Sequence, residues 1–147
     1  SLFQQGARAA AHLAGASAPI VENMAECGFH VGVVFQMVDD ILDIEGDAAQ
    51  VGKPVGIDLR EGNPSLPIVL GLQRDAEVKH FFANPEPTED QVITALRRIR
   101  DCGAVEEARA YAATFAARAK ECLNRLPRNP EVTVLPQLID QLLARGA

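Results

Sequence analysis

Residues 20–44 place the strongest constraint on the fold. They are apolar over most of their length, and helix-breaking residues bound them, with Pro19 before and Gly46 after. Such a segment predicts one helix of roughly 35 Å, at a rise of about 1.5 Å per residue. Gly28 and Gly32 lie four residues apart and share one face of this helix. We therefore expect a long helix with a face that allows close packing by another helix.

Further breaks divide the rest of the chain into shorter segments. A capping box is expected from Thr88 to Gln91 at the start of a helix, and Gly103 is expected to end that helix. Ser65 is a candidate N-cap, with Pro67 in the first turn that follows. We expect helices over five further segments, which are residues 2–14, 65–82, 88–102, 105–126 and 132–144.

Helical periodicity places three apolar stripes toward a core. Their members are Val92, Leu96 and Ile99; Ala108, Ala112, Phe115, Ala119 and Cys122; and Leu135, Leu138, Ile139 and Leu142. We find no convincing alternating strand and no internal repeat. The sequence therefore predicts an all-α helical bundle, with residues 1–147 belonging to a single domain.

Charge and hydropathy exclude two classes of partner. The chain has 147 residues, a net charge of −6 and a pI near 5.0, so a generally basic surface that binds nucleic acid is not expected. No apolar run reaches the about 18 residues that a transmembrane segment needs. Within residues 36–64, seven acidic side chains accompany two basic ones, so most of the net charge gathers there.

Three cysteines, Cys27, Cys102 and Cys122, lack C-x-x-C spacing. An odd count without metal-ligand spacing predicts reduced thiols in a cytoplasmic protein. The three histidines are scattered, and each is expected to be structural or exposed. Neither a Ser-His-Asp nor a Cys-His arrangement is expected.

Three carboxylates gather near the end of the long helix. Asp39 and Asp43 are four residues apart, Asp40 and Asp43 are three apart, and Gln36 precedes Asp40 by four. A helix C-terminus disfavours added negative charge, and like charges at this spacing repel one another. A bound cation would relieve both penalties, and oxygen ligands favour Mg²⁺ or Mn²⁺. The alternative is an exposed acidic helix end.

Residues 45–64 follow these acids with four glycines and two prolines, which predicts a structured loop or a pair of turns. Lys53 is a cation among glycines that permit close approach, so it could contact phosphate oxygens as a point charge. The alternative for Lys53 is a solvated surface residue.

Together these residues resemble the trans-type polyprenyl (isoprenyl) diphosphate synthase family. The resemblance is carried by the pattern F-Q-x-x-D-D-x-x-D, a spacer and G-K-P-x-G-x-D-L-x-E-G-x-x-x-L-P, over residues 35–67. It implies an isoprenoid (terpenoid) synthase-type fold. It also implies Mg²⁺-dependent condensation of an allylic diphosphate with isopentenyl diphosphate. Many members carry Lys where Asn63 stands, so position 63 receives no phosphate role.

The resemblance implies a role for each residue of the motif. Asp39 would be the principal metal ligand and, with Lys53, a catalytic residue. Asp40 and Asp43 would be supporting metal ligands, and Gln36 and Lys53 would bind the substrate diphosphate. Asp58 would pin the loop or hold a metal-bound water.

The family's first aspartate-rich motif does not occur in this sequence. The chain therefore resembles a C-terminal half, which we expect to be inactive by itself and to form a homo-oligomer. Two alternatives stay open, which are a related terpene cyclase and a non-catalytic helical partner subunit.

Overall fold

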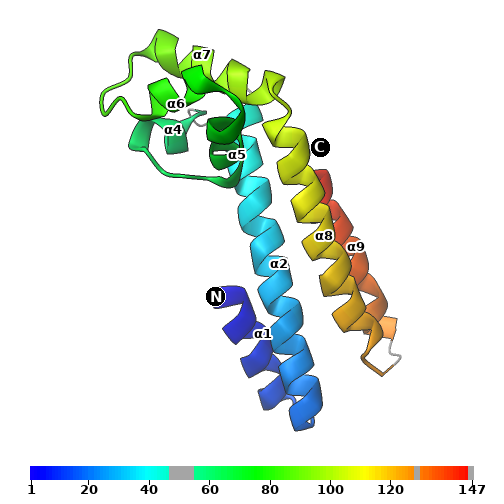
Figure 1. The fold of residues 1–147 in the computed structure, drawn as a ribbon. Helices are drawn as coiled ribbons and strands as arrows, with labels where there is room; N and C mark the ends of the chain where they lie inside the picture. The colour runs from blue at the N-terminus through cyan, green and yellow to red at the C-terminus, as the bar shows by residue number, and fades with distance from the viewer. Residues whose placement is uncertain (47–54, 128–129, 146–147) are drawn as a thin grey trace. The chain divides into compact units, whose positions relative to one another are not determined.

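A computed structural model describes residues 1–46, 55–127 and 130–145, in which helices are joined by turns and short irregular segments, without a strand (Figure 1). The elements are α1 (Leu2–Leu13), α2 (Ala18–Glu45), α4 (Ile57–Glu61), α5 (Leu66–Arg74), α6 (Ala76–Phe82), α7 (Glu89–Asp101), α8 (Ala104–Asn124), the 3₁₀ helix η1 (Pro130–Thr133) and α9 (Val134–Ala144). The predicted all-α class is confirmed. Within the described residues, no helix is long and apolar enough to cross a membrane.

The segment predicted as one helix over residues 65–82 is two helices, α5 and α6. Asp75 separates them because its backbone is extended, with φ −133° and ψ 116°. Its side chain then accepts hydrogen bonds from the N–H groups of Glu77 and Val78 and so caps α6. The prediction missed this break because an aspartate inside an apolar pattern leaves the helical period intact.

The chain divides into two compact units, and the boundaries fall within α2 and α8. The first unit contains residues 1–38 and 111–147, and the second contains residues 39–110. The expectation of a single domain stays a prediction.

In the first unit, α1 packs closely against α2, and Figure 1 shows the two helices side by side. A Cβ atom added at Gly28 would lie 2.5 Å from the carbonyl oxygen of Phe3 and 2.8 Å from the Cβ of Ala7. At Gly32 an added Cβ would lie 3.1 Å from the Cβ of Phe3. The expectation that these two glycines allow close helix packing is confirmed.

The stripes on the two C-terminal helices are only partly buried as predicted. Ala108, Ala112, Ala119 and Cys122 are buried, whereas Phe115 is half-buried. On α9, Ile139 is buried, but Leu138 is 52% exposed, so its predicted inward position is wrong. The helix also begins at Val134, after η1, and not at residue 132.

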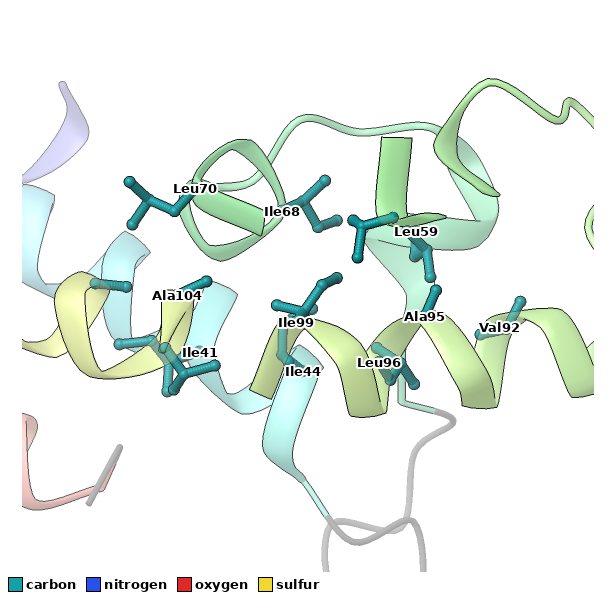
Figure 2. Close-up of a cluster of buried hydrophobic side chains, with 13 residues drawn as sticks. Ile41, Ile44, Leu59, Ile68, Leu70, Val92, Ala95, Leu96, Ile99 and Ala104 are labelled. Atoms are coloured by element: carbon teal, nitrogen blue, oxygen red, sulfur yellow. The ribbon is translucent and has the colours of Figure 1, made fainter. Parts of the chain in front are cut away.

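The core of the second unit gathers apolar side chains from six helices, α2 and α4 to α8 (Figure 2). Ile41 and Ile44 come from α2, Leu59 from α4 and Ile68 from α5. The predicted stripe of α7 is buried here as expected, with Ile99 at 0% exposure. The capping box at the start of α7 is also confirmed, through Thr88 and Gln91. This core fixes the end of α2 that carries the aspartates.

The α1–α2 contact gives a first prediction. Gly28→Ala should lower the free energy of unfolding by about 1–3 kcal/mol. The new methyl group would overlap backbone atoms of α1, which cannot move aside by a change of rotamer. Chemical denaturation followed by circular dichroism measures the change. Gly6→Ala is the matched control, because nothing lies within 4 Å of an added Cβ there. It should stabilise the protein by up to about 1 kcal/mol through helix propensity. Equal effects of the two substitutions would contradict the close contact.

Candidate active site

Asp39, Asp40 and Asp43 lie on the last turns of α2, as predicted. Asp39 is exposed, and Asp40 and Asp43 are half-buried. Among the residues that the structure describes, none forms a hydrogen bond or ion pair with the Asp39 carboxylate. Gln36 lies three residues earlier on the same helix and is exposed. Of the three carboxylates, that of Asp39 therefore keeps the most coordination capacity for a ligand.

Asp43 holds the start of α4. Its Oδ1 accepts a hydrogen bond from the backbone N–H of Ile57 at 3.0 Å, and its Oδ2 accepts one from Asp58, also at 3.0 Å. The backbone carbonyl of Asp43 accepts from the N–H of Gly56 at 2.8 Å. Because the N-cap residue Gly56 has no side chain, Asp43 supplies the cap from α2.

Asp40 supplies the N-terminal cap of α5. Its Oδ2 accepts a hydrogen bond from the backbone N–H of Leu66 at 3.2 Å, whereas the N-cap residue Ser65 makes no side-chain cap bond. Ser65 was correctly predicted as the N-cap position, but the capping oxygen comes from another helix. Both half-buried aspartates thus face helix N-termini, whose positive partial charge favours carboxylates.

Gly56 is required at its position for two reasons. Its φ of +72° lies in the left-handed region. A Cβ added there would also lie 2.9 Å from Cδ1 of Leu96 and 3.2 Å from Cγ1 of Val92. The turn that enters α4 therefore lies directly on α7.

A bidentate ion pair fixes α4 to α7 from the outside. Arg60 donates to the two carboxylate oxygens of Glu89 at 2.7 and 2.8 Å, and it donates to the carbonyl of Val55 at 3.4 Å. The hydrogen bond from Arg60 lowers the pKa of Glu89 below its ordinary value. This pair could not be predicted from the sequence, because 29 residues separate its members.

Asp58 stabilises its own turn. Its backbone carbonyl accepts from the N–H of Asn63 at 2.8 Å, and its Oδ1 accepts from the Asn63 side-chain amide at 3.4 Å. That amide also donates to Glu61 at 3.0 Å. These contacts agree with the first of the two roles expected for Asp58, which is to pin the loop.

Lys53 lies outside the described residues, and so does the expectation that the loop brings it near Asp39. The metal role of the three aspartates and the substrate role of Gln36 stay predictions. The carboxylates that are present fit a hard divalent cation, because Asp39 is exposed and an ionised carboxylate offers about four lone-pair positions. Asp40 and Asp43 keep part of that capacity after their hydrogen bonds to the backbone.

Comparison with known proteins agrees with the all-helical fold and with the aspartate-rich end of α2. The family model described as polyprenyl synthetase matches residues 1–99. The chain therefore belongs to the polyprenyl synthetase family.

Individual relatives match across most of this chain. Solanesyl-diphosphate synthase 2, chloroplastic, from Oryza sativa subsp. japonica is 32% identical over 99% of this chain and 36% of that protein. Heptaprenyl diphosphate synthase component 2 from Geobacillus stearothermophilus is 37% identical over 79% of this chain and 37% of that protein. A crystal structure of a polyprenyl synthase from Caulobacter crescentus, complexed with calcium and isoprenyl diphosphate, matches with a TM-score of 0.91. It is 31% identical and covers 99% of this chain and 46% of that one. The chain thus spans less than half the length of these relatives.

The anchored loop gives a second prediction. Gly62 has a φ of +71°, close to that of Gly56, but nothing lies within 4 Å of an added Cβ. Gly62→Ala should therefore cost only the backbone strain, about 1–2 kcal/mol. Gly56→Ala should cost this strain and about 1–3 kcal/mol more for the contact with Leu96. Urea titration of both variants measures the difference, and a Gly62→Ala variant as unstable as Gly56→Ala would refute the packing argument.

Proposed function

We propose that the protein to which these residues belong is a prenyltransferase that condenses an allylic diphosphate with isopentenyl diphosphate, with Mg²⁺ or Mn²⁺ as cofactor. The observation that carries the proposal is the exposed Asp39 carboxylate, without a described partner, beside two aspartates that hold the starts of α4 and α5. The names of the matched relatives, which are prenyl diphosphate synthases, support the same reaction class.

Each residue of the motif would have a separate role that depends on its position. Asp39 would hold the metal, and Asp40 and Asp43 would add partial ligation while they keep the starts of α5 and α4 in place. Lys53 would contact the diphosphate oxygens, and Gln36 would orient the leaving group. The divalent metal, when bound, supplies positive charge that neutralises the departing diphosphate.

The reaction needs no nucleophile from the protein. The bond between the allylic carbon and the diphosphate oxygen breaks, and its electron pair leaves with the diphosphate. The alkene of isopentenyl diphosphate then supplies electrons for the new carbon–carbon bond, and loss of a proton forms the new double bond. Groups placed beforehand around the developing charge stabilise the transition state more than the bound substrate.

The 147 residues alone are proposed to lack turnover, because the family's first aspartate-rich motif is not among them. The protein is proposed to assemble as a homo-oligomer. A relative named as component 2 of a synthase supports a hetero-oligomer as the competing arrangement. Light scattering of the protein with and without co-expressed partners separates the two. Cytoplasmic location stays a prediction that rests on the three free thiols.

A third prediction tests the role of Asp39 in the full-length protein. Asp39→Ala should lower kcat by about 10²–10³-fold at saturating Mg²⁺, because it removes a contact that is strongest in the transition state. Lys53→Ala should lower kcat less, since the metal shares its task. Incorporation of labelled isopentenyl diphosphate measures both variants. Asp101→Ala, at the exposed C-terminal end of α7, is the matched control and should leave kcat unchanged. Near-normal turnover of Asp39→Ala would contradict the mechanism.

A fourth prediction separates anchoring from ligation. Asp43→Ala should lower both turnover and stability, because the N–H groups of Ile57 and Asp58 lose their acceptors. Hydrogen bonds to a charged group contribute about 1.5–3 kcal/mol each. Asp39→Ala should leave the free energy of unfolding within about 0.5 kcal/mol of the parent. Thermal denaturation of the two variants measures the contrast, and equal stability would remove the anchoring role of Asp43.

A further inference from the structure

Glu26, His30 and Cys122 form a cluster in the first unit that has no part in the proposed reaction. Glu26 and His30 are one turn apart on α2, and Cys122 lies on α8. One potential ligand atom from each residue lies within 4.8 Å of the other two. The Nε2 of His30 is 3.9 Å from Oε1 of Glu26. His30 and Cys122 are 92 positions apart in the sequence, and the fold brings them together.

The cluster has a buried floor and an exposed edge. Cys122 is 0% exposed and His30 is 8% exposed, whereas Glu26 is exposed. A hollow of about 340 Å³ is lined by both Glu26 and His30. An ion from solvent can therefore approach through Glu26 and meet the histidine and the thiol behind it.

The histidine ring is held in place and is available for a ligand. It lies against Phe29 and Phe115, with centroids 5.4 and 5.7 Å away. Its Nδ1 is buried and has no hydrogen-bond partner among the described residues. Burial lowers the pKa of His30 below its ordinary value. A buried polar atom without a partner is costly, so a ligand bound to this ring nitrogen would be favourable.

A cation from the chain itself already contacts the cluster. Nη2 of Arg125 lies 2.8 Å from Oε2 of Glu26 and 2.9 Å from Sγ of Cys122. The Arg125 side chain is 56% exposed, so it can swing into solvent and leave these two groups to another cation. The guanidinium therefore marks a position where the fold stabilises positive charge.

We propose that Glu26, His30 and Cys122 form a Zn²⁺ site that ties α2 to α8, and that Arg125 competes with the metal for it. A carboxylate, an imidazole and a thiolate are typical Zn²⁺ ligands, in contrast to the oxygen-only aspartates at the end of α2. Tetrahedral bonds of about 2.0–2.3 Å place ligand atoms roughly 3.3–3.8 Å apart, so the cluster closes by about 1 Å on binding. The Cys122 thiol releases its proton to solvent as the metal–sulfur bond forms.

Titration of the purified, reduced protein with Co²⁺, a spectroscopic substitute for Zn²⁺, tests the site. We expect one equivalent to bind with a thiolate-to-metal charge-transfer band in the near ultraviolet, and Zn²⁺ to displace it. Cys122→Ser should abolish this band, whereas Cys102→Ser should keep it, because Cys102 belongs to the other unit. A parent protein without the band, or a Cys122→Ser variant that keeps it, would overturn the proposal.

Substitutions at two exposed positions provide a second test if the substitution of the buried Cys122 unfolds the protein. Glu26→Gln should weaken Co²⁺ binding about 10–100-fold. Arg125→Gln should strengthen it about two- to fivefold, since the competing cation is gone. A cluster that serves only as an ion pair predicts no Co²⁺ affinity in either variant. Unchanged or weaker binding in Arg125→Gln would exclude Arg125 as a competitor.

Discussion

The carboxylate of Asp43 accepts two backbone N–H groups at once, and the position of α4 depends on this contact. A five-residue helix such as α4 does not form by itself, because nucleation costs more than its few hydrogen bonds return. Asp43 supplies the acceptors that its N-cap glycine lacks. The buried side chain of Leu59 then fixes α4 on the core of the second unit.

This contact also explains why acidic side chains are tolerated at the C-terminal end of α2, where the helix dipole opposes them. Asp43 and Asp40 face the N-termini of two other helices, whose dipoles favour them. Glu45 forms an ion pair with Arg109 of α8. The unfavourable charge is thus offset locally for three of the four acids, and Asp39 is the one that has no such partner among the described residues. The proposed cation would therefore relieve repulsion mainly at that residue.

Much of the fold could be predicted from residues with a local effect on the backbone. Pro19, Gly103 and the capping box at Thr88 marked helix boundaries, and period 3.6 identified the buried stripe of α7. The contacts that build the candidate site could not be predicted in this way. Asp40 reaches Leu66 across 26 residues, and His30 meets Cys122 across 92, and neither pairing leaves a periodic trace. The break at Asp75 was missed for a related reason, since its capping role depends on a backbone conformation that composition does not reveal.

Asp75 also links α6 to α7 in the second unit. Its carboxylate accepts from Glu77 and Val78 at the start of α6 and also from Nε of Arg98, on α7, at 3.1 Å. With seven residues, α6 is too short to persist alone in water. Its buried residue Val78 packs into the core that α7 helps to form. The helix therefore has its own cap, but its packing surface comes in part from α7, so the stability of α6 depends on an element that follows it in the chain.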